Sequence, residues 1–206
     1  NWSVRELDRQ INASLHDRLS LSKDKEGILK LATEGQIIET AKDIIKDPYI
    51  LEFLNLPESN IYSETDLETA LINKLEHFLL ELGKGFTFAG RQVRFTFDEE
   101  HFRVDLVFYN RLLKCFVLID LKIGKLSHQD VGQMDMYVRM YDEIKRTEGD
   151  NPTIGIILCE EKDHAEVRYS VLNDNQKLFA TKYKLYIPTE EELIQEIAQI
   201  RSQMNL

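Results

Sequence analysis

A continuous run of apolar residues, Cys115 to Ile119, ends abruptly in the charged residues Asp120 and Lys122. Such a run predicts a central strand that is buried on both faces of a sheet. Helical periodicity precedes and follows it, over residues 65–82 and 128–147, and residues 153–159 form a second buried apolar run. Further strands are expected over residues 86–97, 102–109 and 182–187. The order helix, strands, helix, strand predicts a mixed α/β layer architecture.

The first 60 residues are polar and read as helical, and the breaker cluster Leu56-Pro57-Glu58-Ser59-Asn60 follows them. We therefore expect a helical N-terminal region over residues 1–60 and a second domain over residues 61–206. The chain begins with Asn1 instead of Met, which suggests a longer gene product. A capping-box pattern at Thr189 predicts a final amphipathic helix.

Composition limits the functions that this chain can have. A net charge of -10 over 206 residues argues against coating nucleic acid through bulk positive charge. The longest apolar stretches are far shorter than the roughly 18 residues of a membrane span, so no membrane partner is expected. Cys115 and Cys159 lie inside apolar runs, which predicts buried free thiols and a reducing, cytoplasmic location.

Two carboxylates stand out because they occupy strands that should be buried. Asp105 interrupts the alternating segment 102–109, and Asp120 ends the central apolar run. If residues 110–113 form the turn, Asp105 opposes Leu118 and lies diagonal to Asp120, within reach of one shared ion. Oxygen ligands without His or Cys favour Mg²⁺ or Mn²⁺, and Lys122 beside them suits phosphoryl chemistry. The ordinary alternative is a structural ion pair, either Asp120 with Lys122 or Asp105 with Arg103.

Three further polar residues have ordinary explanations from spacing alone. Glu68 completes a Thr65-x-x-Glu68 capping box, which favours a cap over a third acidic ligand. Gln133 and Tyr137 lie four residues apart on a stripe different from that of Val131 and Val138, as an ordinary solvated pair would.

The order of these residues resembles the PD-(D/E)XK nuclease superfamily, and longer motifs resemble its YhcG-type bacterial family of nucleases. The matching stretches cover nearly the whole chain: residues 66–72, 78–83, 90–92, 105–109, 115–122, 132–133 and 150–155, with residues 2–7 and 19–25 resembling the tail of that family's N-terminal helical region. The resemblance implies a restriction-endonuclease-like αβββαβ core with a mixed central sheet. It also implies that the N-terminal region helps to bind DNA.

The resemblance assigns roles to individual residues. Asp105 and Asp120 match the acidic metal ligands and Lys122 the catalytic lysine. Glu68 matches the helix carboxylate, and Gln133 the helix glutamine near the site. Glu68 can therefore both cap and turn inward. Two positions depart from the family pattern: Val104 replaces Pro, and Asp120 stands where Glu is common.

These residues predict a Mg²⁺- or Mn²⁺-dependent endonuclease that acts on DNA. A homodimer and a monomer are both compatible with the sequence. Around the two carboxylates, residues 84–97 carry three basic and no acidic side chains, and residues 101–125 carry five basic against two acidic. The expected nucleic-acid contacts are Arg91, Arg94, Arg103, Lys125 and Tyr137. The alternative is an inactive nucleic-acid-binding or assembly module on the same fold. A nucleotide-binding domain is disfavoured, because no G-x-G-x-x-G or P-loop pattern occurs.

Overall fold

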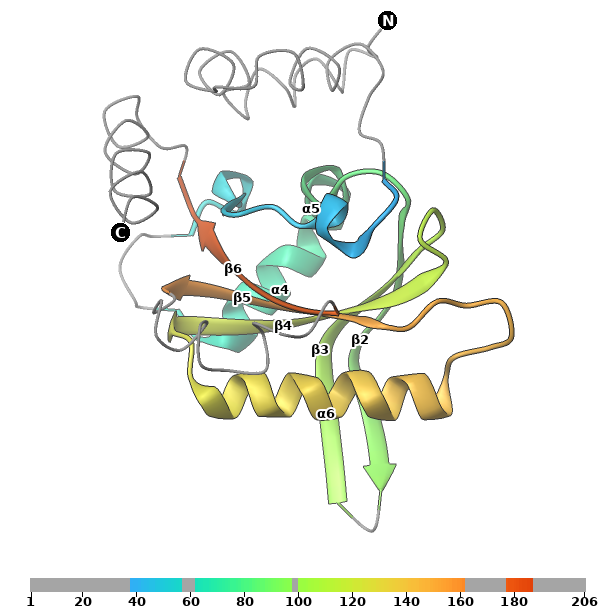
Figure 1. Cartoon of the computed structure of the whole chain (residues 1–206). Helices are drawn as coiled ribbons and strands as arrows, with labels where there is room; N and C mark the ends of the chain where they lie inside the picture. The colour runs from blue at the N-terminus through green and yellow to red at the C-terminus, as the bar shows by residue number, and fades with distance from the viewer. Residues whose placement is uncertain (1–37, 57–61, 98–99, 162–176, 187–206) are drawn as a thin grey trace, which may run out of the picture. The chain divides into compact units, whose positions relative to one another are not determined.

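The structure is a computed structural model that describes residues 38–56, 62–97, 100–161 and 177–186 (Figure 1). Residues 38–185 form one compact unit. Its elements are, in order, the 3₁₀ helix η1 (Ala41–Ile44), β1 (Tyr49–Ile50), the 3₁₀ helix η2 (Glu52–Leu54), α4 (Glu64–Asn73), α5 (Leu75–Leu82), β2 (Phe86–Phe97), β3 (Glu100–Asn110), β4 (Cys115–Lys125), α6 (His128–Ile144), β5 (Ile154–Glu161) and β6 (Leu178–Lys184). The expected final helix after Thr189 and residues 1–37 and 57–60 of the expected N-terminal helical region lie outside the described residues.

Six strands form one mixed sheet in the order β1-β6-β5-β4-β3-β2. The pairs β1–β6, β6–β5 and β5–β4 are parallel, whereas β4–β3 and β3–β2 are antiparallel. The predicted mixed sheet and αβββαβ order are confirmed in the elements from α4 to β5. As predicted, β4 is central, and Val117 to Leu121 are buried along it.

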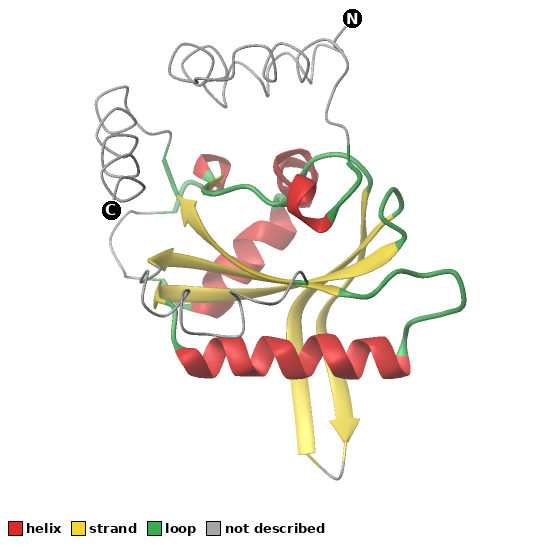
Figure 2. Cartoon of the chain, viewed as in Figure 1, coloured by secondary structure: helices red, strands yellow, loops and turns green. Residues whose placement is uncertain are grey.

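Helices cover both faces of the sheet (Figure 2). Helices α4 and α5 share one apolar cluster with Leu106, Phe108 and Ile119, and α6 shares the other with Val107 and Leu118. Within the described residues, no helix combines the length and the apolar character that a membrane span requires. The predicted burial of both free cysteines is confirmed.

The helix predicted over residues 65–82 is two helices that meet at Lys74, whose backbone leaves the helical region at φ -117° and ψ 30°. Ser63 starts α4: its backbone N–H donates to the Asp66 carboxylate (2.8 Å), and its hydroxyl accepts from the Asp66 N–H (3.2 Å). Gly83 ends α5 as predicted, and its φ of 103° suits a residue without a Cβ atom.

Residues 41–54 belong to the core of the sheet domain and do not form a separate region. Tyr49 and Ile50 pair with β6, and the side chains of Ile44, Tyr49 and Leu51 are fully buried. The compact unit begins at residue 38, so the structure moves the boundary that we expected near residue 60 toward the N-terminus.

The turn between β3 and β4 differs from the predicted one. Asn110 pairs with Cys115 and residues 111–114 form the turn, one residue later than expected. The Asn110 side chain favours this arrangement, since its Oδ1 accepts from the backbone N–H groups of Leu112 and Leu113. The last register pair is Leu106 with Ile119, so the next step along both strands brings Asp105 level with Asp120 and not with Leu118.

Strand β3 changes faces at Asp105, opposite Gln92 of β2. The alternation predicted over residues 102–109 places Val104 on the same face as Leu106, but Val104 packs with α6 and Leu106 packs with α4 and α5. The register passes from Arg91–Leu106 to Val93–Val104 without pairing the residues between them, and Gln92 has a left-handed φ of 46°. This irregularity breaks the period-2 alternation on which the prediction rested.

Candidate functional site

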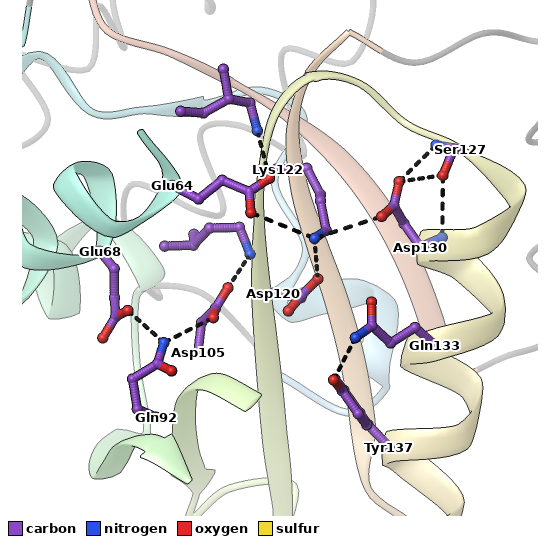
Figure 3. Close-up of polar contacts among 12 residues, drawn as sticks. Glu64, Glu68, Gln92, Asp105, Asp120, Lys122, Ser127, Asp130, Gln133 and Tyr137 are labelled. Atoms are coloured by element: carbon purple, nitrogen blue, oxygen red, sulfur yellow. Dashed lines mark hydrogen bonds and ion pairs between the residues drawn. The ribbon is translucent and has the colours of Figure 1, made fainter. Parts of the chain in front are cut away.

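The two predicted carboxylates lie where β3 and β4 separate. Beyond Leu106 and Ile119, β4 stays paired with β5, while β3 stays paired with β2 and runs with it past α6 (Figure 1). Asp105 and Asp120 occupy the opening between them (Figure 3). The strands therefore bring two carboxylates together at a place where neither ladder requires them.

Asp105 is held by hydrogen bonds on both oxygens. Its Oδ1 accepts from Gln92 Nε2 at 3.0 Å, and its Oδ2 accepts from the backbone N–H of Leu121 at 2.9 Å. The second bond ties the end of β3 to β4 after the ladder has stopped. This carboxylate is fixed in position before any ligand is bound.

Asp120 is only 4% exposed, and its Oδ2 is a buried oxygen without a hydrogen-bond donor. Burial, with the neighbouring charge of Asp105 as the second cause, raises the pKa of Asp120 to about 7, although Lys122 opposes the rise. When Asp120 is ionised, the positive charge of Lys122 therefore does not fully offset its burial and the repulsion from Asp105.

Lys122 lies among three carboxylates. Its Nζ is 3.5 Å from Asp120, 3.6 Å from Asp130 at the start of α6 and 3.7 Å from Glu64 at the start of α4 (Figure 3). Burial acts to lower the pKa of Lys122, but the surrounding carboxylates outweigh it and raise that pKa above its ordinary value. Lys122 is thus a positive charge at neutral pH.

Glu68 is not the helix cap that its spacing suggested. Ser63 and Asp66 form the capping box, which leaves Glu68 in the second turn of α4 with 6% exposure. Its Oε2 accepts from Gln92 Nε2 at 2.5 Å, so it joins Asp105 through one shared amide. Burial raises the pKa of Glu68; Gln92 counters this rise, and Asp105 adds to it.

Gln133 and Tyr137 face the site from α6 (Figure 3). Gln133 Nε2 donates to the Tyr137 hydroxyl at 2.5 Å. Tyr137 is 2% exposed and packs in the same cluster as Val131 and Val138, so the prediction of a separate stripe is wrong for Tyr137. The ring is core, and only the hydroxyl is available to the site.

The four basic residues that we expected to contact nucleic acid, Arg91, Arg94, Arg103 and Lys125, are all exposed. Arg94 and Arg103 are direct partners across β2 and β3. Like charges in directly opposed positions destabilise a sheet unless an anion lies beside them.

The donor set suits a hard divalent cation. Two carboxylates, one with a buried oxygen that accepts no hydrogen bond, match Mg²⁺, which keeps several waters and needs only one or two protein carboxylates. Among the residues that the structure describes, no group of three or more His, Cys, Asp and Glu side chains could hold a metal ion, so Glu68 does not complete a three-carboxylate cage. A cation here would depend on water and substrate oxygens for its remaining ligands.

Sequence reasoning missed Gln92, Glu64 and Asp130 as members of this site. Asp130 forms a capping box with Ser127, so the pattern Ser127-x-x-Asp130 could have placed it at the start of α6. Gln92 gave no signal in periodicity or charge, since a neutral amide in a strand is common.

Comparison with protein families gives one match to a family model, the YhcG PDDEXK nuclease domain, over residues 42–198. The curated protein "Putative nuclease YhcG" of Escherichia coli (strain K12) is 41% identical over 201 residues, covering 98% of this chain and 53% of that protein. The chain thus spans about half the length of this relative.

Solved structures of low sequence identity also resemble the chain. A repair endonuclease from Pyrococcus abyssi is 21% identical with a TM-score of 0.41, over 63% of this chain and 50% of that one. EndoMS in complex with double-stranded DNA is 18% identical with a TM-score of 0.42, over 65% of this chain and 50% of that one.

Proposed function

This chain belongs to the YhcG PDDEXK nuclease family, and from that premise we propose that it hydrolyses phosphodiester bonds in DNA with Mg²⁺ or Mn²⁺ at Asp105 and Asp120. The observation that carries the proposal is the buried Oδ2 of Asp120, which accepts no hydrogen bond and has only the Lys122 ammonium at 3.5 Å to balance the second carboxylate, Asp105. Two such groups repel each other, and a divalent cation is the ligand that relieves the repulsion.

Each residue of the site has a proposed task. A cation bound here would polarise the phosphate and acidify a water molecule. Lys122, kept positive by its three carboxylate neighbours, orients the attacking water and offsets charge that develops on the phosphate. The Gln133 amide and the Tyr137 hydroxyl position the phosphate or the water from the side of α6.

Binding of DNA is proposed for the exposed basic residues near the site. Val93, Phe95, Phe102 and Val104 pack on the α6 side of the β2–β3 ribbon, so the alternating residues Arg94 and Arg103 lie on its other face. Asp105 is two residues from Arg103 along β3. A phosphate backbone along this face would relieve the repulsion between the two arginines and approach the carboxylates.

The N-terminal region, the cellular location and the oligomeric state complete the proposal. We propose that the helical region within residues 1–60 adds DNA contacts and that the protein works in the cytoplasm, where its substrate would be. A homodimer is tested by sedimentation equilibrium. This chain spans about half of its curated relative, so residues outside it can also contribute to the choice of substrate.

Cleavage of duplex, single-stranded and branched DNA in Mg²⁺ or Mn²⁺ tests the function. Asp120→Ala and Lys122→Ala should each lower the rate at least about a hundredfold, as expected for loss of one transition-state contact. Asp135→Ala, which removes an α6 carboxylate that pairs with Arg139, is the matched control. Equal rates in all four proteins would reject the proposal, and tight binding without metal-dependent cleavage would favour the assembly module.

A further inference from the structure

Gln92 occupies an irregular position in β2. Its φ of 46° lies in the left-handed region, where a residue other than Gly, Asn or Asp is uncommon. At this point the β2–β3 register omits one pair, and the even-numbered apolar residues of β3 change faces between Val104 and Leu106. A strained residue persists only where its surroundings hold it, so the contacts of its side chain are informative.

The side chain of Gln92 spans two carboxylates of the site. Its Nε2 donates to Glu68 Oε2 at 2.5 Å and to Asp105 Oδ1 at 3.0 Å (Figure 3). The amide nitrogen thus donates both of its hydrogens, one to an acid of α4 and one to an acid of β3. Among the described residues, Asp105 has one other hydrogen-bond donor, Leu121 N–H, and Glu68 has no second one.

The chemistry of an amide suits this place better than a charged donor would. Arg or Lys between Glu68 and Asp105 would neutralise the site and compete with a cation, whereas an amide holds the oxygens without adding charge. An apolar side chain would leave both acids free to move apart. The negative charge therefore stays available and is fixed in place.

We propose that Gln92 is a positioning residue that preorganises the cation site by holding Glu68 and Asp105 toward each other. This inference rests on the proposed function. The left-handed backbone at Gln92 is part of this arrangement, because it lets β2 place the Gln92 amide between the two carboxylates. Gln92 acts through the acids and does not itself need to touch the substrate.

Four proteins test this role. Gln92→Gly removes the amide and relaxes the left-handed backbone. Gln92→Asn keeps an amide and tolerates the same φ, although its arm is shorter. Lys114→Gly relaxes another left-handed residue, with φ 51° in the exposed β3–β4 turn, far along the strand from the carboxylates. The wild type completes the set, and circular dichroism melts show which proteins are folded.

Calorimetric titration with Mn²⁺ alone is the main measurement. We expect Gln92→Gly to bind Mn²⁺ at least tenfold more weakly than the wild type, Lys114→Gly to equal the wild type, and Gln92→Asn to recover part of the loss. Cleavage by Gln92→Gly should show a lower kcat with an unchanged KM for DNA, and excess Mn²⁺ should restore part of the rate. A structural role alone would lower the melting temperature without moving the affinity of the folded protein.

The outcomes separate this inference from the function beneath it. Wild-type affinity for Mn²⁺ in folded Gln92→Gly overturns the role of Gln92 and leaves the proposed nuclease intact. Absence of Mn²⁺ binding in the wild type overturns both. If Gln92→Gly does not fold, Gln92→Ala, which also lacks the amide, takes its place: weaker Mn²⁺ binding by the folded variant supports the role, and wild-type binding overturns it.

Discussion

At the scale of single residues, Asp120 serves the site at the expense of stability in the metal-free protein. Its pKa is raised to about 7 by burial and by Asp105, against an unfolded value of about 3.9. The folded state therefore binds the proton more tightly, and the contribution of this group to stability is complete below about pH 4 and lost as the pH rises through 7. The loss has a limiting slope of about 1.4 kcal/mol per pH unit.

We therefore expect Asp120→Asn to stabilise the metal-free protein at pH 8 relative to the wild type, by more than it does at pH 5. Urea unfolding in EDTA at the two pH values measures the difference. Mn²⁺ should then stabilise the wild type at pH 8 but not the variant, because only a ligand that prefers the folded state raises stability. Parallel pH profiles for the two proteins would contradict the raised pKa.

Site residues were predictable from the sequence where a charged side chain occupied an otherwise apolar strand. Asp105, Asp120 and Lys122 stood out because charges rarely occupy strands that are otherwise apolar. Glu68 was assigned to the wrong cap because Thr65 and Ser63 both offer the spacing, and only the helix start decides between them. Gln92 was not predictable, since its role comes from a backbone conformation that no local pattern encodes.

At the scale of elements, the β2–β3 ribbon sets two arginines against each other. Arg94 and Arg103 are paired across the strands and exposed, so an anion that approaches this face would relieve their repulsion. If each contacts one phosphate of duplex DNA, the double variant Arg94→Ala/Arg103→Ala should reduce the slope of log affinity against log salt by about 1.8.

Fluorescence anisotropy with labelled duplex DNA in Ca²⁺, over a series of salt concentrations, measures this slope. Arg139→Ala serves as the control, because it removes an exposed arginine on α6 that is already paired with Asp135. The ribbon is not the binding face if both proteins lose affinity equally and keep the wild-type slope.

Elements were easier to predict than their pairing. Helical and strand periods located α4 to β5, because the residues that pack on each face recur at the period of the element. The β3–β4 register and the change of faces at Gln92 were wrong, since a turn shifted by one residue and an unpaired step both alter which residues meet. Asp105 and Asp120 nevertheless lie close together, because both errors leave them at the same end of the β3–β4 ladder. That they form one cation site stays a prediction.

At the scale of the whole molecule, the segment 38–56 before α4 is bound to the sheet domain by strand pairing, hydrogen bonds and an ion pair. Tyr49 and Ile50 pair with β6, and Glu81 of α5 accepts a hydrogen bond from the Ile50 N–H at 3.1 Å. Lys46 forms an ion pair with Glu81 at 3.3 Å, and the Thr181 hydroxyl donates to the Lys46 carbonyl. Composition did not predict this, because residues 38–56 are flanked by polar sequence and breakers that resemble a linker.

We expect a fragment of residues 61–206 not to fold, whereas a fragment of residues 38–206 does. Deletion of residues 38–60 removes five buried apolar side chains, Ile44, Tyr49, Ile50, Leu51 and Leu54. At about 1.5–3 kcal/mol each they contribute about 8–15 kcal/mol, comparable with the whole stability of a typical domain. The deletion also strips buried Glu81 of its partners on the segment. Far-ultraviolet circular dichroism and urea unfolding of the two fragments make the comparison. Equal unfolding midpoints would mean that the segment is only laid on the surface, and the boundary near residue 60 would then be the real one.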